Sequence, residues 1–577
     1  MKNLPSVKAI SFKNADVLVS QLSNVKITSF KNADVLISQL SKHKEAWLQV
    51  GIPERIIYLR YCLDGVQKVA AKWIERVCLE KGIDPTKSLA GEEWLAGPMV
   101  IVRNLRLLIE ALEASGQPKP KRWITRPDGQ VVAQVLPGSF IDNIFWMGFT
   151  GEVWIEPGKP ATQGLIYRKK HDKGSVALIL EAGNNLSLSL MDTLYKLFVE
   201  DQVVIIKISQ INEYDISFIE EAFRSLIEDG FFKVVYGDAE LGSYLCHHPE
   251  IDTVHITGSD RTHDAIVWGK TFEEQLQRKA SNQPLLKKPI TSELGCVTPV
   301  LVVPGVWSKS DLIFQARHVA SMVTHNASFN CDAAKVLVTA KGWKQRDTFL
   351  EILHQELAAI PTRKAYYPGA RERYEAFLDQ YPQAQALVYA DEESIPWTVI
   401  PQVPPKIGEY ALNHEAFCGL LAEVTLDAED PGEFLAKAVN FANQKVKGTL
   451  SCVLLVHPKT EKAYSAEIDR AIANLRYGGI GVNVWTGIIY ALGLTTWGAF
   501  PGNTLTDIGS GRGVVHNAYM FDHPQKSVVR SPFRIYPTPA WFATHKNLLQ
   551  LGQRVTAFEA YPTWGKLLDV VFAALKG

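Results

Sequence analysis

Apolar residues recur at helical spacing over an early stretch of the chain. From residue 42 to about residue 115, they fall three or four positions apart, as in the series Ile56, Leu59, Leu63 and Val66. This spacing places them on one face of a helix. We therefore expect packing helices over this stretch.

Farther along, short runs of apolar residues alternate with longer helical patterns. Such alternation is typical of βαβ units around a parallel sheet and predicts a doubly wound nucleotide-binding domain. A second alternating region begins near Ser310 and predicts a second α/β domain. The predicted strands are 175–183, 203–209, 232–237, 253–259 and 298–305, then 336–341, 448–456 and 480–485, with a further extended run at 164–170.

The stretch Tyr477–Thr506 contains no charged residue. Its many glycines and threonines make it a poor membrane span compared with a run of about 20 predominantly apolar residues. We expect no membrane span, and interpret this stretch as a buried strand and loop lining a pocket.

The N-terminal region contains an internal repeat. Ser11–Ser23 (SFKNADVLVSQLS) returns almost unchanged as Ser29–Ser41 (SFKNADVLISQLS). Two copies are too few for a solenoid. We expect a locally duplicated surface helix and assign it no function.

Composition narrows the range of partners. With 61 basic and 61 acidic residues among 577, the net charge gives no reason to expect binding to nucleic acid or to an anionic membrane. Seven dispersed cysteines without CxxC spacing argue against disulfides and structural zinc. Together with a first segment that lacks a signal-peptide apolar run, this predicts a cytoplasmic protein.

Cys331 is a candidate nucleophile. It stands between a helical pattern and an apolar strand, where a lone cysteine is ordinarily a small buried side chain. A cysteine that forms an acyl intermediate needs a base to activate the water that releases the product. Glu293, in TSELGCVTPVLVV, is a candidate for that base, although by itself it could be a strand-edge carboxylate.

Several motifs together resemble those of the aldehyde dehydrogenase superfamily. In chain order they are EAGNNLSLS, VVIIKIS, HITGSD, SELGCVTP and FNCDAA, within a resemblance that covers roughly Ala46 to Phe533. The resemblance implies an α/β fold with a Rossmann-type nucleotide-binding domain, an α/β catalytic domain and a small β oligomerisation arm. The expected segments are a duplicated helical segment over 1–42, a dinucleotide-binding domain over 43–150 and 182–296, the arm over 151–181 with part of 500–540, a catalytic domain over 297–500 and a C-terminal extension over 541–577.

The resemblance also implies roles for individual residues. Cys331 would be the nucleophile, Glu293 the base, and Asn184 the donor that holds the oxyanion together with the backbone N–H of Cys331. Asn184 is preferred to Asn185 because of its spacing to Lys207. The residues implied in binding NAD or NADP are Lys207, Gln210, Gly258, Ser259, Glu415 and Phe417.

Three positions depart from the family pattern. Gln210 stands where NAD-preferring members commonly carry a glutamate, which leaves NAD and NADP both open. His263 stands where a glycine usually lets a helix approach the cofactor, so a side chain there would disturb pyrophosphate binding. Cys296 replaces the second glycine of the glutamate–leucine–glycine–glycine motif and needs no catalytic role.

Two other motifs are interpreted as structural. The sequence GSGRG at 509–513 resembles a family turn, and it lacks the lysine of a phosphate-binding loop. Adjacent histidines at His247 and His248 rarely point the same way, and no partner cluster accompanies them. We expect no metal site.

The predicted function is oxidation of an aldehyde to a carboxylic acid with NAD or NADP, through a thioester on Cys331. One alternative is a coenzyme A-acylating aldehyde dehydrogenase or acyl-CoA reductase; another is a cofactor-binding assembly protein that has lost catalysis. The resemblance further implies a homodimer or homotetramer. An apolar helical face near the C-terminus is expected to dock on its own subunit or on a second copy; its residues are Trp564, Leu567, Leu568, Val571, Phe572 and Leu575.

Overall fold

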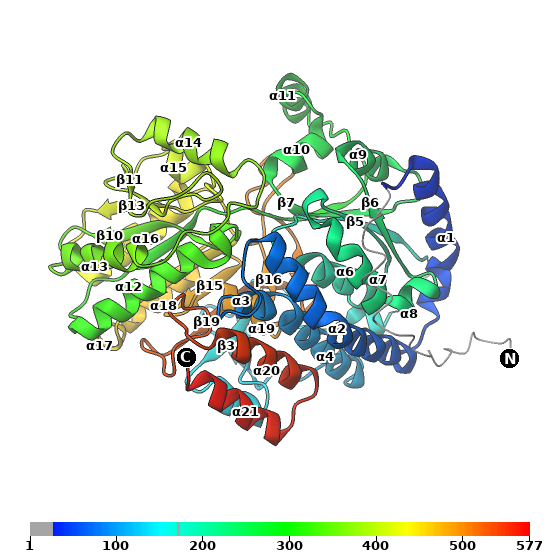
Figure 1. Cartoon of the computed structure of the whole chain (residues 1–577), viewed down its shortest axis with the longest axis horizontal. Helices are drawn as coiled ribbons and strands as arrows, with labels where there is room; N and C mark the ends of the chain where they lie inside the picture. Colours follow the sequence, from blue (N-terminus) through cyan, green and yellow to red (C-terminus); the bar gives the residue numbers. More distant parts are fainter. Residues whose placement is uncertain (1–26, 170–172) are drawn as a thin grey trace.

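The strands expected from the runs rich in valine and isoleucine form two large sheets. The computed structural model describes residues 27–169 and 173–577. A six-stranded sheet lies in one half of the molecule and an eleven-stranded sheet in the other, each with helices packed on it (Figure 1). The two α/β halves agree with the predicted alternation of strands and helices.

The six-stranded sheet has the order β17-β8-β7-β4-β5-β6. Strand β4 is central: the chain proceeds from it to β5 and β6 on one side, then returns to β7 and β8 on the other. This reversal leaves a crevice outside the carboxyl ends of the strands, where α/β proteins bind ligands. The strands are β4 (Val176–Leu180), β5 (Val203–Ile208), β6 (Phe232–Tyr236), β7 (Thr253–Gly258), β8 (Ile290–Leu294) and the antiparallel β17 (Gly511–Arg512).

Helices of the expected helical stretch and of the βαβ crossovers surround this sheet. Helix α2 is the longest of the described helices, with 29 residues, and its buried face joins the core of the six-stranded sheet. The helices are α2 (Ile52–Glu80), α3 (Ala90–Ala96), α4 (Pro98–Glu113), α6 (Leu188–Phe198), α7 (Ile216–Ala222), α8 (Arg224–Glu228), α9 (Ala239–His247), α10 (Asp260–Trp268) and α11 (Phe272–Ser281), with the 3-10 turn η4 (Gln210–Asp215).

The second copy of the repeat forms helix α1 (Phe30–Leu48). The Ser29 hydroxyl caps it by accepting the backbone N–H of Asn32 at 3.2 Å. Ile37, Leu40 and Trp47 bury one face of this helix. The first copy, Ser11–Ser23, lies outside the described residues.

The eleven-stranded sheet has the order β1-β2-β3-β19-β15-β14-β9-β10-β13-β12-β11. Its middle strands, from β19 to β12, pair in parallel, and antiparallel pairs extend it at both ends. The strands are β1 (Arg122–Thr125), β2 (Val131–Leu136), β3 (Thr150–Ile155), β9 (Thr298–Val302), β10 (Ala334–Ala340), β11 (Gln385–Ala386), β12 (Thr398–Ile400), β13 (Leu420–Leu426), β14 (Ser451–Leu455), β15 (Gly479–Val482) and β19 (Pro524–Arg530).

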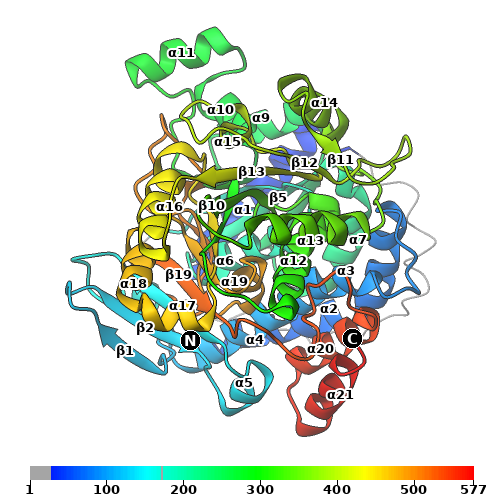
Figure 2. The same cartoon turned by 90° about the vertical axis from the view of Figure 1, so that its left-hand side faces the viewer.

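Helices flank this second sheet as well (Figure 2). They are α12 (Lys309–Thr324), α13 (Arg346–Ala358), α14 (Ala370–Gln380), α15 (Tyr410–Asn413), α16 (Pro431–Lys445), α17 (Pro458–Ala463), α18 (Ser465–Asn474) and α19 (Gly487–Leu492), with α5 (Phe140–Phe145) beside the antiparallel extension and the 3-10 turn η5 (His325–Ser328) after α12. A short ribbon pairs β16 (Trp497–Gly498) with β18 (Val514–His516).

The expected arm over 151–181 needs correction, because the structure divides this range between the two sheets. Strand β3 belongs to the antiparallel extension, next to β2 and β19. Strand β4, by contrast, is the fully buried centre of the six-stranded sheet. Strands β1 and β2, expected in the dinucleotide-binding domain, also belong to the antiparallel extension. A run of apolar residues marks burial, and does not reveal which sheet buries it.

The extended run expected at 164–170 is also wrong over its described part, residues 164–169. Leu165–Tyr167 forms the 3-10 turn η3. Gly164 precedes it with a φ of 58°, a left-handed conformation that breaks extended backbone.

The uncharged stretch Tyr477–Thr506 is largely buried, and contributes β15, α19 and β16. No helix in the described part of the chain is long and apolar enough to cross a membrane. The stretch packs in the protein interior, as expected, but none of its residues lines the cleft described below.

The C-terminal extension forms helices α20 (Leu548–Ala560) and α21 (Trp564–Ala574), which lie together along the lower side of the molecule in Figure 1. Helix α20 packs tightly on α3, since a Cβ at Gly91 would lie 2.1 Å from the backbone of Leu548. Of the expected docking face of α21, only Leu567 is buried, while Leu568 and Phe572 are exposed on this chain.

Candidate active site

A cleft of about 990 Å³ lies between the two halves. One wall is formed by the carboxyl ends of β4, β5 and β7, at the point where the strand order reverses. The other wall is formed by segments that follow β8, α12 and α15. All nine site residues expected from the sequence line it: Asn184, Lys207, Gln210, Gly258, Ser259, Glu293, Cys331, Glu415 and Phe417.

Cys331 lies in the cleft wall, three residues after η5 and just before β10. It is the one partly exposed cysteine of the seven, all of which are free thiols. Burial raises the pKa of its thiol well above the ordinary value, and the carboxylate of Glu293 raises it further. The thiol therefore needs a nearby base before it can act as a nucleophile.

Glu293 lies on β8 with a buried side chain that is 2% exposed. Burial raises the pKa of its carboxyl to about 8, although the nearby Cys331 thiol opposes this shift. Its Oε1 has no hydrogen-bond partner among the described residues. A carboxyl with a pKa near neutrality and a free oxygen suits a general base.

The GSGRG turn supports the segment that carries Glu293. Gly511 pairs with Glu293 across β17 and β8, and a Cβ at Gly511 would lie 2.1 Å from the carbonyl oxygen of Ser292. The Ser510 hydroxyl donates to the Gly295 carbonyl at 2.9 Å. These contacts agree with the structural interpretation of the motif.

Asn184 follows β4 and lines the cleft together with Cys331. Its Nδ2 donates to the backbone carbonyl of Phe329 at 2.9 Å, which uses one of the two N–H groups of the amide. Asn185 points elsewhere, since its Oδ1 accepts from the backbone and hydroxyl of Ser187, both at 3.1 Å. Of the two asparagines, only Asn184 lines the cleft.

Lys207, Gln210, Gly258 and Ser259 gather at the other end of the cleft, where β5 and β7 end. The Ser259 hydroxyl caps α10 by accepting the backbone N–H of Thr262 at 3.1 Å. The N-terminus of this helix faces the cleft, an arrangement that favours anions. Burial lowers the pKa of the Lys207 ammonium, and the Glu181 carboxylate raises it.

His263 does not face the cleft. Its side chain is fully buried, and its Nδ1 lies 3.3 Å from Asp264. Thr262, Ala265 and Ile266 of the same helix line the cleft. The expectation that His263 disturbs pyrophosphate binding is therefore wrong, because α10 turns this side chain into the protein interior.

Glu415 and Phe417 approach the cleft from the loop after α15. Burial raises the pKa of Glu415 to about 7, and the nearby Lys335 ammonium opposes this shift. Its Oε1 is buried with no hydrogen-bond partner in the described part of the chain. Phe417 has a φ of 42°, and its carbonyl accepts from Arg373 Nη2 at 3.3 Å.

Three further residues around the cleft had not been expected. Glu181 joins the end of β4 to η4, since its carboxylate accepts the backbone N–H of Ser209 at 2.6 Å. Lys335 donates to the Ser328 carbonyl at 3.1 Å. Arg373 holds the loop that carries Phe417. Glu181 stands within the motif around Asn184, whereas no local pattern marks Arg373, which comes from α14.

The cleft has features that fit a dinucleotide. It combines strand ends and a helix N-terminus at one end with buried acceptors at the other, on Asn184, Glu293 and Glu415, that have no hydrogen-bond partner among the described residues. Within residues 27–169 and 173–577, no group of three or more histidine, cysteine and acidic side chains could hold a metal ion. This includes the surroundings of His247 and His248.

Comparisons with known proteins point to one family. Residues 185–370 match the model of the aldehyde dehydrogenase family. A segment of 76 residues is 38% identical to 4-trimethylaminobutyraldehyde dehydrogenase A of Danio rerio, and covers 13% of this chain and 12% of that relative. The matched segment is thus a small part of the relative.

Solved structures resemble this chain over most of its length. An NAD-dependent aldehyde dehydrogenase from Sinorhizobium meliloti matches with a TM-score of 0.59 and 19% identity, over 89% of each chain. A glyceraldehyde-3-phosphate dehydrogenase from Methanocaldococcus jannaschii, complexed with NADP, matches with a TM-score of 0.59 and 14% identity, over 88% of this chain and 96% of its own. At such low identity, these matches show that the fold is shared.

Proposed function

Because this chain belongs to the aldehyde dehydrogenase superfamily, we propose that it oxidises an aldehyde to a carboxylic acid with NAD or NADP. The observation that carries the proposal is that Cys331, Glu293 and Asn184 meet in one cleft, next to the carboxyl ends of β4, β5 and β7. A nucleophile, a base and an oxyanion donor are the groups that acyl chemistry at a cysteine requires.

Acylation begins at Cys331. Glu293 takes the proton of the thiol, and the thiolate attacks the carbonyl carbon of the aldehyde. The free N–H of the Asn184 amide and the backbone N–H of Cys331 hold the oxygen as it gains negative charge. After the hydride leaves the former aldehyde carbon, a thioester on Cys331 remains.

The residues at the other end of the cleft would hold the dinucleotide. Lys207 and Gln210 would bind the adenosine ribose, and Ser259 with the N-terminus of α10 would bind the pyrophosphate. Glu415 would bind the nicotinamide ribose, and Phe417 would contact the ring. When bound, the dinucleotide supplies the hydride acceptor.

Deacylation returns the cleft to its initial state. Glu293, after losing the thiol proton to solvent, removes a proton from a water molecule, and the resulting hydroxide attacks the thioester carbonyl. Asn184 again holds the oxyanion. The C–S bond breaks, the carboxylic acid leaves, and Cys331 recovers its proton.

The test is replacement of the nucleophile. Cys331→Ala should abolish reduction of NAD or NADP with a panel of aliphatic and aromatic aldehydes. Cys62→Ala, which changes a buried thiol on α2, should retain activity. Turnover by folded Cys331→Ala protein comparable with the parent chain would contradict the proposal. Adding coenzyme A tests the acylating alternative, since formation of acyl-CoA in place of the acid would identify the acceptor.

The proposal includes assembly and location. Strand β1 is an edge of the eleven-stranded sheet, and its Trp123 side chain is 41% exposed. An open edge is a site for pairing with another chain, so we infer a homodimer or homotetramer, measurable by light scattering after gel filtration. Seven free thiols favour a reducing compartment, in keeping with the cytoplasmic location expected from the sequence.

A further inference from the structure

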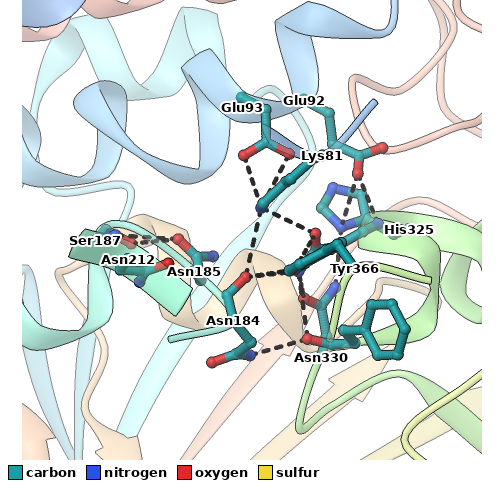
Figure 3. Close-up of polar contacts among 12 residues, drawn as sticks. Lys81, Glu92, Glu93, Asn184, Asn185, Ser187, Asn212, His325, Asn330 and Tyr366 are labelled. Atoms are coloured by element: carbon teal, nitrogen blue, oxygen red, sulfur yellow. Dashed lines mark hydrogen bonds and ion pairs between the residues drawn. The ribbon is translucent and has the colours of Figure 1, made fainter. Parts of the chain in front are cut away.

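A buried polar cluster stands behind Asn184, on the side away from the cleft. At its centre is Lys81, the C-cap residue directly after α2, with a side chain that is 6% exposed. Figure 3 shows its ammonium between Glu93 and the backbone of Asn184. Lys81 donates to both carboxylate oxygens of Glu93, at 3.1 and 2.9 Å, and to Asn326 Oδ1 at 3.1 Å.

Lys81 is held there as a cation. Burial is the largest effect and lowers its pKa, but the charge of Glu93, the nearby Tyr366 and the hydrogen bond to Glu93 together offset this effect and leave the pKa raised. The ammonium also lies 4.9 Å from the centroid of the Tyr366 ring, which favours a positive charge. A second ion pair, between Glu92 and Arg363 at 2.7 Å, lies beside it.

The backbone carbonyl of Asn184 is the point on which this cluster converges. It accepts from Asn326 Nδ2 at 2.9 Å, from the Tyr366 hydroxyl at 2.9 Å and from Lys81 at 3.5 Å. Three donors on one carbonyl fix the backbone at Asn184 from behind. The Asn184 side chain is fixed to the carbonyl of Phe329, two residues before Cys331.

The same cluster holds the turn that leads to Cys331. Asn326, Ala327 and Ser328 have φ values of 51°, 52° and 71°. These values lie in the left-handed region, which residues other than glycine rarely adopt. Such backbone persists only where surrounding contacts impose it. The backbone N–H of Asn326 donates to Glu92 at 2.6 Å, and its Nδ2 donates to Asn330 Oδ1 at 3.1 Å.

The cluster also joins the two halves of the molecule. Helix α2 packs in the hydrophobic core of the six-stranded sheet, whereas Tyr366 packs against that of the eleven-stranded sheet. Asn184 belongs to the first half and Cys331 to the second, so the contacts around Lys81 set the position of one relative to the other.

From these contacts we propose that Lys81, together with Glu93, Asn326 and Tyr366, is a positioning residue for the oxyanion site formed by Asn184 and Cys331. This proposal rests on the proposed function of that site. Loss of the Lys81 ammonium removes one of the three donors to the Asn184 carbonyl and the donor to Asn326 Oδ1. This loosens the backbone at Asn184 and the strained turn, and the Asn184 amide and Cys331 then move apart. Cofactor binding at the ends of β5 and β7 lies outside the cluster and is unaffected.

The test uses a charge-balanced double variant, Lys81→Met with Glu93→Gln, so that no buried carboxylate is left unpaired. We expect kcat to fall by about 10- to 100-fold, the loss that misplacement of reacting groups causes. Binding of the reduced cofactor, measured by its fluorescence, should stay within about threefold. The matched control is Lys526→Met: Lys526 is 1% exposed and donates to the carbonyls of Ile472, Ala473 and Leu475, away from the cleft.

A second variant covers the case in which the double variant does not fold. Tyr366→Phe removes only the hydroxyl that donates to Asn184, and should lower kcat by about threefold to tenfold without changing cofactor binding. A kcat unchanged in the folded double variant, or in Tyr366→Phe, overturns the proposal. So does an equal loss in the double variant and in Lys526→Met, which would indicate a general structural effect.

The role of the Lys81 cluster can be tested even if the chain does not oxidise aldehydes. If the parent chain oxidises no aldehyde, the proposed function fails, and the rate of Cys331 alkylation by iodoacetamide, followed by peptide mass spectrometry, becomes the readout. A changed rate in the double variant, with the parent rate kept in Lys526→Met, supports a role of the cluster in fixing the Cys331 turn. Equal rates in all three proteins overturn it.

Discussion

The carboxylate of Glu415 lies directly against the α-carbon of Gly295, so that a Cβ at position 295 would stand 1.9 Å from Oε2. This approach joins the loop that carries Glu415 to the segment that carries Glu293. Gly295→Ala must displace the carboxylate, at a cost of about 1–3 kcal/mol for overpacking. We expect cofactor binding to weaken by about tenfold, measured by fluorescence titration. Gly565→Ala on α21, where nothing lies within 4 Å of the new Cβ, should bind like the parent chain, and equal affinities for both variants would contradict this role of Glu415.

Replacement of each of the two adjacent asparagines by alanine should have sharply different effects on kcat. Asn184→Ala removes the proposed oxyanion donor, and kcat should fall by about 10²- to 10³-fold. Asn185 accepts from Ser187 at the start of α6 and does not line the cleft. Asn185→Ala should therefore cost some stability and little of kcat per folded molecule. Steady-state kinetics and thermal unfolding of both variants will separate the effect on kcat from the effect on stability. A lower kcat in Asn185→Ala than in Asn184→Ala would refute Asn184 as the oxyanion donor.

Glu293→Gln should separate the two chemical steps. At pH 9, removal of the neighbouring carboxylate lowers the pKa of the Cys331 thiol and partly compensates for the lost base, so that acylation slows less than thioester hydrolysis. Hydrolysis loses the base that activates water and slows by about 10²- to 10⁴-fold. Rapid mixing should show a burst of reduced cofactor of about one equivalent per site, followed by a slow phase. Intact-protein mass spectrometry should find the acyl group on Cys331. Steady-state turnover equal to that of the parent chain would exclude Glu293 as the base for water.

The rate of deacylation should depend on pH through Glu293. The carboxyl has a pKa of about 8 because it is buried, and only its deprotonated form can activate water. The rate should rise about tenfold per pH unit well below pH 8 and level off above it. Single-turnover measurements between pH 6 and pH 9.5 will show the inflection. Glu293→Gln should lack it, and a profile that falls with rising pH would contradict a basic role for this carboxyl.

Much of the fold was predictable because local sequence reports burial. The valine- and isoleucine-rich run at 203–209 became β5, and the three- and four-residue spacing around Leu59 and Leu63 became α2. Strands buried on both faces leave a continuous apolar signal, which can be interpreted without knowledge of their neighbours. Which sheet a strand joins is a separate matter, and the division of 151–181 between β3 and β4 shows this.

Several residues expected around the cleft stand next to an element that the local pattern identifies, whereas Glu415 and Phe417 were expected from the family resemblance alone. Lys207 and Ser259 lie at strand ends, and Cys331 lies between a helix and a strand. The positioning residues have no such mark. Lys81 meets Asn326 across 245 positions of the chain and Asn184 across 103, and neither pairing leaves a trace in hydrophobic periodicity.

The sequence by itself determined the α/β class, the position along the chain of many strands and the candidate chemistry of Cys331, Glu293 and Asn184, because periodicity and motifs are local. Only the tertiary structure decided that His263 turns away from the cleft, that Asn185 bonds to Ser187 outside the cleft, and that Lys81 lies behind Asn184. The physical reason is that side-chain direction and buried ion pairs depend on how distant segments pack, since a buried charge is stable only where the fold brings it a partner.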